Sequence, residues 1–221
     1  MEHSSEKEQQ DGRPGKSDGR RLYQSALRDQ RAVDTRRRIV DAARGLFSDR
    51  GFAGTTIAVI AKHAGVATPT VYAVFSSKAE IVRELIDCLE TEADGDKWRD
   101  RITDEPEPER KLEIYAAWHR VFFSTGKDVL RAATYAGDDP AVLDLRAQGD
   151  SNALAWLAPI IKALSEAKLL APGLDSQHAL DRALLLSSVE LYFRATTGRN
   201  WTDNEYQQWL TESLRQQLLH P

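Results

Sequence analysis

A single cysteine, Cys88, stands among the 221 residues of the chain. It cannot close an intramolecular disulfide, and the paired Cys and His spacing of a zinc site is absent, so we expect no metal. No stretch approaches the roughly 18 uncharged apolar residues of a membrane-spanning helix. The segment from Met1 to Lys7 leads into no apolar run of the kind that a secretory signal has. These absences predict a reducing, cytoplasmic location with no membrane partner.

Patterns that carry catalysis are missing as well. No Ser, His and Asp set stands in a motif context, no Gly-rich phosphate loop is present, and Cys88 is isolated beside Asp87. The sequence therefore predicts neither an enzyme nor a cofactor. A redox role for Cys88 as an intermolecular thiol stays open, although a lone cysteine is more often inert.

The composition is that of a globular protein with an uneven charge. Hydrophobic residues make up 41% of the chain and charged residues 29%, which is enough to bury a core. Residues 1–85 hold 15 Lys and Arg against 11 Asp and Glu, whereas residues 86–221 hold 15 against 23. A basic front and an acidic rear indicate that the front half meets a polyanion. An ordinary solvated surface accounts for the same asymmetry about equally well.

The first residues differ from the rest of the chain. Residues 1 to about 33 are rich in Gln, Ser, Gly, Asp and Arg and poor in apolar side chains. Such a segment buries too little surface to offset the entropy of ordering, so we expect a disordered arm over residues 1–33. Its basic side chains could follow a minor groove, but acidic side chains nearly balance them, and the role of the arm stays open.

Apolar residues recur at helical spacing along most of the remainder. Ile39, Ala43, Leu46 and Phe47 fall at i, i+4, i+7 and i+8, which is one face of an α-helix. No alternating run is long enough for a convincing strand, so the expected fold class is all-α. After a connection beyond residue 93, the expected helices cover about 107–124, 127–136, 140–169, 175–198 and 203–218.

Three short helices are expected in the front half, and a tight turn joins the second and third. Gly65 allows the turn, Val66 plugs the gap beneath it, and the small side chain of Ala61 lets the two helices cross closely. Thr68-Pro69 opens the third helix as its cap and first residue. This is the helix-turn-helix pattern, whose third helix can enter a DNA major groove. A purely structural helical hairpin is the alternative.

The residues of this pattern resemble a known family. The segment from Thr56 to Lys78, TIAVIAKHAGVATPTVYAVFSSK, resembles the signature of the tetracycline-repressor (TetR) family. Residues 39–47, IVDAARGLF, are similar to the family's first helix. The resemblance covers roughly residues 35–85 and combines several constraints in a fixed order.

The resemblance implies an all-α protein in three parts. The arm over residues 1–33 precedes a helix-turn-helix domain over residues 34–85, and a fourth helix joins that domain to a larger helical ligand-binding and dimerisation domain over residues 86–221. It also implies a cytoplasmic, homodimeric transcriptional regulator. Such a regulator is usually a repressor of a palindromic double-stranded DNA operator and is released by a small-molecule effector.

Site residues are carried over onto matching positions. Thr56, Tyr72 and Lys78 correspond to contacts with the DNA backbone, and the start of the third helix to contacts with base edges. Ala73 and Val74 depart from the pattern, because many members carry an aromatic residue or a histidine there; this removes a phosphate donor and leaves an apolar reading surface. The DNA-binding set implied is Thr56, Thr68, Pro69, Thr70, Tyr72, Ala73, Val74 and Lys78.

In the rear half, aromatic side chains cluster on successive expected helices. The resemblance implies a ligand pocket there, although an aromatic stripe at helical spacing more often belongs to a packed core. The pocket residues we expect are Trp118, His119, Phe122, Phe123, Tyr135 and Trp156.

The last two expected helices resemble the family's dimer interface, which would form a four-helix bundle with a second copy. The interface residues we expect are Leu184, Leu191, Tyr192, Trp209, Leu210 and Leu214. The alternatives to a ligand-released repressor are an activator, a corepressor-dependent regulator, or a helical ligand-binding protein whose helix-turn-helix is structural. The operator sequence, the effector and the regulated genes are not encoded in any pattern of the sequence.

Overall fold

The computed structural model describes residues 16–134 and 140–220. Within these ranges the regular structure is helical apart from one isolated antiparallel bridge between Leu170 and Leu219, which confirms the expected all-α fold class. The helices are α1 (Lys16–Arg50), α2 (Ile57–Ala64), α3 (Thr68–Val74), α4 (Lys78–Glu92), α5 (Gly95–Asp104), α6 (Pro108–Thr125), α7 (Lys127–Thr134), α8 (Pro140–Glu166), α9 (Ser176–Leu186), α10 (Val189–Thr196) and α11 (Asp203–Leu218).

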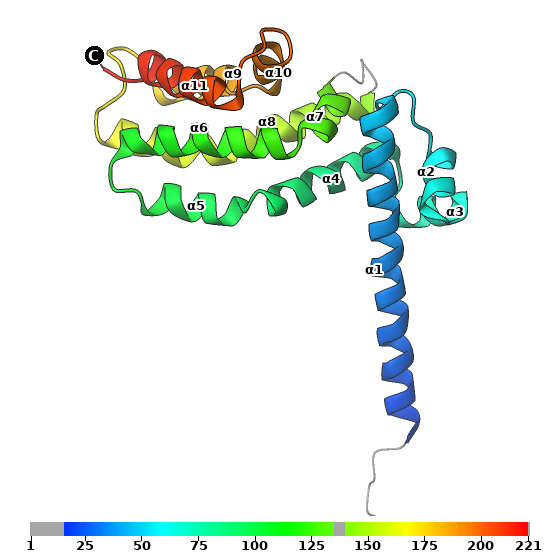
Figure 1. Ribbon diagram of the computed structural model, residues 1–221. Coiled ribbons are helices and arrows are strands. Elements are labelled where there is room, and N and C mark those ends of the chain that lie inside the picture. Colours follow the sequence, from blue (N-terminus) through cyan, green and yellow to red (C-terminus); the bar gives the residue numbers. More distant parts are fainter. Residues whose placement is uncertain (1–15, 135–139, 221) are drawn as a thin grey trace, which may run out of the picture.

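The helices after α3 are stacked in layers beside the end of α1 (Figure 1). α4 leads away from α1 and continues into α5, and the layer of α6, α7 and α8 covers both. α9, α10 and α11 form the outermost layer, in which α11 packs on α6 and α9 packs on α8. α2 and α3 lie on the other side of α1, so that α1 and α4 separate the helix-turn-helix from the rear layers.

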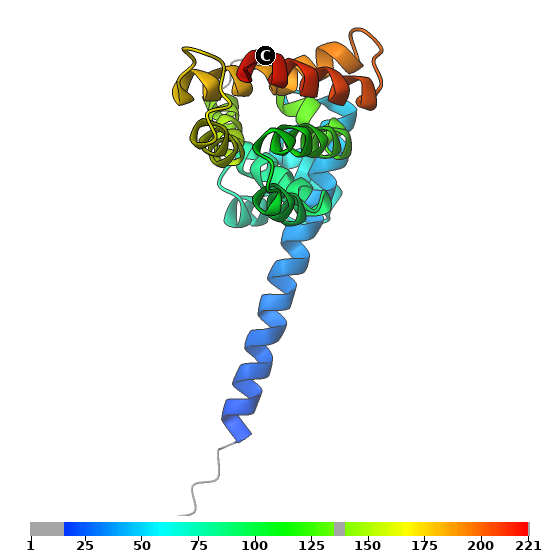
Figure 2. The same ribbon diagram turned by 90° about the vertical axis from the view of Figure 1, so that its left-hand side faces the viewer.

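The N-terminal half of α1 extends away from every other described helix (Figures 1 and 2). The expectation of a disordered arm is therefore wrong for residues 16–33, whereas residues 1–15 lie outside the described part. Composition indicates only how little surface the segment can bury, whereas a helix that is already nucleated by packed residues can continue through good helix formers without burying them. Between Ala26 and Asp34 the side chains are exposed, and Gln30 Nε2 donates to Asp34 Oδ1 at 3.1 Å, one turn further on.

The core of the front part is built from the apolar face that the sequence predicts. Ile39 and Phe47 of α1, Ile60 of α2, Val71 of α3 and Phe75 behind it are all fully buried. One side of each of α1, α2 and α3 therefore packs into the same small core. The remaining faces of α2 and α3 are left toward solvent.

Two rear segments differ from the expected helices. α5 was expected to be a connection, because its six charged residues obscure the pair Trp98 and Ile102, which lie four residues apart and pack inward. The helix expected over residues 175–198 is two helices, α9 and α10, which end and begin on either side of Ser187 and Ser188. α8 is continuous through Gly149 and covers most of the helix expected over residues 140–169.

Within the described ranges no single helix is long and apolar enough to cross a membrane. α2 and α3 reach the required length and composition only as a pair, and they are bent by 101° where they meet.

Candidate functional site

The turn between α2 and α3 has the geometry that the sequence predicts. Gly65 has φ 65° and ψ 37°, the left-handed conformation that glycine adopts without strain. Its N–H and the N–H of Val66 bond to carbonyl groups of the last turn of α2, the latter to Ala61 at 3.0 Å. Ala61 is 2% exposed beneath the crossing. The turn therefore holds α3 at a steep angle to α2, with its outer side uncovered.

One detail of the start of α3 corrects the expectation. Ala67, not Thr68, is the N-cap, and no side chain caps the helix. Thr68 already has helical backbone angles, and Pro69 follows inside the first turn, where it has no N–H that needs a partner. The hydroxyl of Thr68 is thus not used as a helix cap.

The expected base-reading residues gather on the outer side of α3. Pro69, Ala73 and Tyr72 are exposed, and Tyr72 is 56% exposed, which is unusual for so large an apolar ring. Thr68, Thr70 and Val74 are half-buried. Because Val71 and Phe75 anchor the opposite side in the core, α3 presents these side chains from a fixed base.

The two remaining expected contacts lie at helix starts around α3. Thr56 is exposed and caps α2, with its Oγ1 accepting the N–H of Val59 at 3.3 Å. Lys78, the first residue of α4, donates from Nζ to the carbonyl oxygens of Phe52 at 2.6 Å and Thr55 at 2.9 Å. Its ammonium group also lies 3.9 Å from the centre of the Phe52 ring. Lys78 therefore ties the start of α4 to the loop between α1 and α2.

A charged side chain that the sequence analysis missed holds α3 from behind. Arg36 of α1 bonds both carboxylate oxygens of Glu84 on α4, at 2.9 and 2.6 Å, and donates to the carbonyl of Val74 at 3.4 Å. Its guanidinium lies 4.4 Å from the centre of the Phe75 ring. The hydrogen bond from Arg36 keeps the pKa of Glu84 below its usual value despite partial burial. The pair links α1, α3 and α4 into one unit.

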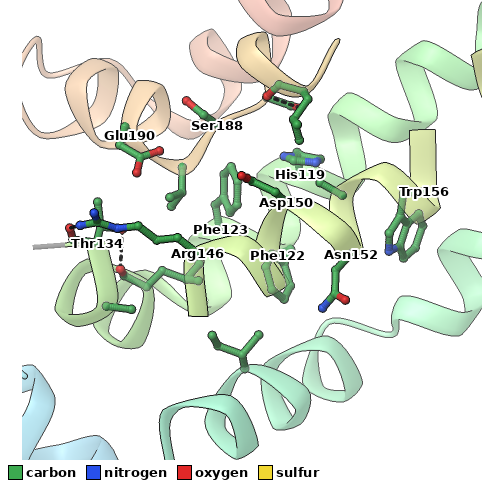
Figure 3. Close-up of a pocket in the computed structure, with 18 of the residues that line it drawn as sticks. His119, Phe122, Phe123, Thr134, Arg146, Asp150, Asn152, Trp156, Ser188 and Glu190 are labelled. Atoms are coloured by element: carbon green, nitrogen blue, oxygen red, sulfur yellow. Dashed lines mark hydrogen bonds between the residues drawn. The ribbon is translucent and has the colours of Figure 1, made fainter. Parts of the chain in front are cut away.

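A cavity of about 190 Å³ lies in the rear part, enclosed by α4, α6, α7, α8 and the break between α9 and α10 (Figure 3). Five of the six expected pocket residues line it; the sixth, Tyr135, lies outside the described residues. The five are Trp118, His119, Phe122, Phe123 and Trp156.

The aromatic walls are themselves in mutual contact. The Trp118 and Trp156 rings are stacked, with centres 4.7 Å apart and planes at 15°, and Phe122 lies 5.2 Å from Trp118. Arg99 of α5 lies over the Trp156 ring at 4.7 Å and donates to the carboxylate of Glu90. The unexpected helix α5 thus supports one wall of the cavity from outside.

Among the described residues, His119 is one of three buried polar residues that line the cavity, together with Thr134 and Ser187. It is 7% exposed and lies between the Tyr115 ring at 4.4 Å and the Phe123 ring at 4.8 Å. Burial lowers the pKa of its imidazole to about 3, so the ring is neutral at physiological pH. Its Nδ1 is buried without a hydrogen-bond partner in the described part of the chain. An unpaired buried nitrogen in a cavity wall is free to bond a ligand.

The cavity also has a charged lining that the sequence did not predict. Glu90, Arg146, Asp150 and Glu190 all contribute to it. In the sequence these residues resemble the solvent-exposed charges of ordinary amphipathic helices. Asp150 of α8 and Glu190 of α10 come to the same cavity only in the folded chain. The pKa of Asp150 is raised by its partial burial and by the negative charge of Glu190.

The expected dimer residues divide into two groups. Tyr192, Leu210 and Leu214 are fully buried inside the protomer, so they belong to its own core and the expectation is wrong for them. The helical stripe was real, but it packs α10 and α11 against α6 and α7. Leu184, Leu191 and Trp209 are half-buried and stay predictions, with Leu184 also lining the cavity. Leu185, next to Leu184 on α9, is 70% exposed.

Arg44 of α1 connects the front part to the rear helices. Its Nε donates to Asp128 of α7 at 3.0 Å, and its Nη1 reaches both oxygens of Glu92 on α4 at 3.1 Å. A longer contact of 3.5 Å reaches the carbonyl of Thr125 at the end of α6. The hydrogen bond to Asp128 raises the pKa of Arg44, with Glu92 adding to it. One guanidinium therefore contacts three rear helix ends.

A third helix that is anchored from behind, follows a tight turn and leaves its outer side uncovered is the arrangement of the helix-turn-helix class of DNA-binding proteins. Residues 39–85 match the family described as "Bacterial regulatory proteins, tetR family". Within its helix-turn-helix part the chain is therefore similar to the regulators of the tetR family, as the resemblance of its sequence implied.

Known proteins resemble the chain over different extents. The HTH-type transcriptional regulator TtgR of Pseudomonas putida is 45% identical over 60 residues, which are 27% of this chain and 29% of TtgR. The chain thus spans less than a third of the length of that curated relative. NalD, the secondary repressor of the MexAB-OprM multidrug efflux pump in Pseudomonas aeruginosa, has a similar fold, with a TM-score of 0.68 at 18% identity over 86% of this chain and 98% of NalD. The structure of SmeT in its triclosan complex also has a similar fold, with a TM-score of 0.66 at 15% identity over 84% of this chain and 91% of SmeT.

Proposed function

We propose that the chain is a dimeric repressor that binds a palindromic operator and is released when a small molecule fills the rear cavity. The observation that carries this proposal is that α4 belongs to both sites. In its first half, Lys78 donates to the loop before α2, and Glu84 accepts from the guanidinium of Arg36 behind α3. Further along, Ile86 and Glu90 line the cavity. A ligand that displaces α4 therefore also moves the DNA-reading helix.

The outer side of α3 is assigned to the major groove. Thr68 and Thr70 offer hydroxyl groups to base edges, and Pro69 and Ala73 offer apolar surface to a thymine methyl group. Tyr72, Thr56 and Lys78 are assigned to the DNA backbone, which positions α3 without reading sequence. Val74 adds no phosphate donor. The exposure of α3 and its anchoring through Val71 support these roles.

The chain divides into a front DNA-binding domain over residues 34–85 and a rear domain over residues 86–221. Dimerisation is assigned to the outermost helices of the rear domain, α9 to α11. A short reading helix contacts only a few base pairs, so a second half-site adds the specificity that an operator needs. Leu185, with 70% of its surface exposed, offers the apolar centre for an isologous contact. The half-buried Leu184, Leu191 and Trp209 would add apolar surface to this interface.

The cavity is assigned to the effector. About 190 Å³ with aromatic walls accommodates a small, mainly apolar molecule. The relatives point the same way, since the SmeT structure is a complex with triclosan and NalD is a repressor linked to a multidrug efflux pump.

The test is a titration of the purified protein against DNA fragments from around its own gene, at two salt concentrations. We expect tight, fragment-selective binding by a dimer. Thr70→Ala should relax the preference at one base pair, by about 1–3 kcal/mol. Tyr72→Phe should weaken binding to every fragment alike, because it removes a backbone contact.

Weak binding that is equal for all fragments and vanishes at moderate salt would contradict the proposal, since it reports only nonspecific electrostatic attraction. A cavity ligand that strengthens operator binding would instead identify a corepressor.

A further inference from the structure

The walls of the cavity suit a flat apolar body. Trp118, Phe122 and Trp156 line one side, and Leu145 and Val189 extend the apolar surface. The faces of aromatic rings carry negative charge density, so such walls attract cations as well as apolar groups. The walls alone would accept a neutral aromatic molecule.

The charged side chains around the cavity are mostly acidic. Glu90, Asp150 and Glu190 line it together with one cation, Arg146 (Figure 3). Arg146 donates from Nη2 to the carbonyl of Thr134 at 2.7 Å, and no ion pair within the described residues joins its guanidinium to either Asp150 or Glu190. The two carboxylates come from different helices, and no ion pair within the described residues includes either of them. Burial raises the pKa of Asp150, and the negative charge of Glu190 raises it further.

Asp150 and Glu190 lie at the mouth of the cavity. Asp150 and Glu190 are exposed on one side while lining the cavity on the other. Glu90 lies deeper on α4, and its carboxylate already accepts from Arg99. The unneutralised negative charge is therefore concentrated at the mouth, where a ligand would keep a charged group close to water.

His119 adds a polar contact further inside. Only 7% of its surface is exposed, and its Nδ1 has no hydrogen-bond partner within the described part of the chain. Because burial lowers its pKa to about 3, the ring carries no positive charge that would repel a cation. Its unpaired nitrogen can bond a polar group on the ligand.

We propose that the effector is a lipophilic cation, with an aromatic body packed against Trp118 and Phe122 and a positively charged nitrogen beside Asp150 and Glu190. This inference rests on the proposed function, since it names the class of molecule for the same cavity. A cation between the two carboxylates relieves their repulsion. An anionic amphiphile, such as a carboxylate with an apolar tail, would add a third negative charge at the mouth.

The experiment measures binding to the DNA-free protein by calorimetry and by quenching of tryptophan fluorescence, which the stacked Trp118 and Trp156 should report. Three probes with one aromatic ring and similar size differ in charge: benzyltrimethylammonium, N-benzylacetamide and phenylmethanesulfonate. We expect the cation to bind at least about tenfold more tightly than the neutral probe, and the anion to bind most weakly. Equal affinities, or a preference for the anion, would overturn the proposal.

Isosteric variants locate the charge effect. Asp150→Asn and Glu190→Gln should each reduce the preference for the cation several-fold, and the double variant should abolish it while leaving binding of the neutral probe unchanged. Glu212→Gln is the matched control, because Glu212 is an exposed acid on α11 outside the cavity lining. A loss of preference in Glu212→Gln equal to that in Asp150→Asn would show that only net charge matters and would overturn the assignment.

Operator release is measured separately with the same probes. If benzyltrimethylammonium binds selectively but leaves the operator bound, the ligand class stands and the proposed release does not. If a neutral or anionic compound releases the operator while cations fail to bind, the proposed function stands and the ligand class is wrong.

Discussion

At the scale of single residues, Lys78 combines two roles that substitution can separate. Its ammonium group holds the carbonyl oxygens of Phe52 and Thr55, while the proposal also assigns it a phosphate contact. Lys78→Met keeps the aliphatic stem but removes the charged donor. Hydrogen bonds to charged groups contribute roughly 1.5–3 kcal/mol, so we expect the variant to lose about 1–3 kcal/mol of unfolding free energy as well as operator affinity.

Urea unfolding and fragment titration of the same samples check this prediction. Lys62→Met, on the exposed side of α2, is the control for removing a surface charge. Unchanged stability of Lys78→Met would contradict the role of its ammonium group in tying α4 to the preceding loop.

His119 makes stability depend on pH. The folded imidazole has a pKa of about 3, against 6.5 for an unperturbed ring. Between these values the unfolded chain binds a proton that the folded chain does not. The free energy of unfolding is therefore not reduced by His119 above about pH 6.5, and it falls as the pH drops toward 3. The slope reaches about 1.4 kcal/mol per pH unit for one proton.

Urea unfolding at pH 7, 6 and 5, at one protein concentration, should therefore show a steady loss of stability in the wild type. Carboxylates whose pKa is lowered in the folded chain, such as Glu84, lose their stabilising effect only as the pH falls below the unfolded value of 4.5, so they add little to the slope between pH 7 and 5. His119→Leu should flatten the dependence between pH 6.5 and 5. An equally steep slope in this variant would mean that another group titrates in the window.

At the scale of helices, local signals explain what the sequence predicted well. The capping hydroxyl of Thr56, the left-handed Gly65 and the small Ala61 act within a few residues of one another, so the geometry of the turn follows from the chain itself. α5 and the break at Ser187 depend on tertiary contacts. Trp98 needs Trp118 of α6 beside it, at 6.4 Å between ring centres, before the charged α5 has a buried side.

The break between α9 and α10 is held by a buried hydroxyl pair. Ser187 Oγ lies 3.0 Å from Tyr115 Oη and donates to the carbonyl of Ala183 at 2.7 Å. Ser187→Ala would leave the fully buried Tyr115 hydroxyl without this partner. We expect a loss of about 1–3 kcal/mol, the typical cost of an unsatisfied buried polar group.

Chemical denaturation measures the loss, with Ser165→Ala on the exposed side of α8 as the control. The double variant Ser187→Ala with Tyr115→Phe removes both polar partners and should recover part of the stability. If the double variant is no more stable than the sum of the single changes predicts, the hydroxyl pair does not couple α6 to the break.

At the scale of the whole molecule, the cavity could be predicted only in part. Its aromatic residues were visible as a stripe, because helical spacing reveals which side chains share a face. The acidic mouth was not visible, since Asp150 and Glu190 come from helices that meet only in the folded chain. Arg44 was hidden for the same reason: its partners Glu92 and Asp128 are 48 and 84 residues away in sequence.

Arg44 supplies a direct path from the cavity to the DNA-binding part. Asp128 lies in the first turn of α7, whose later residues Leu130 and Thr134 line the cavity. Glu92 ends α4, which lines the cavity through Glu90. A ligand that shifts α7 or α4 therefore pulls on α1 through one guanidinium. Coupling between two sites in such proteins amounts to about 1–3 kcal/mol, a change in affinity of roughly 5- to 150-fold.

We therefore expect Arg44→Met to retain operator binding without ligand but to lose most of the ligand's effect on it. The measurement is operator affinity with and without a compound that releases the wild-type protein, together with the affinity of that compound for the DNA-free variant. Arg50→Met, an exposed position at the end of the same helix, is the control. Because the compound should still bind the cavity of Arg44→Met with near-normal affinity, a reduced response isolates the transmission step. A full release response in Arg44→Met would place the coupling elsewhere, with the shared helix α4 as the remaining connection between the two sites.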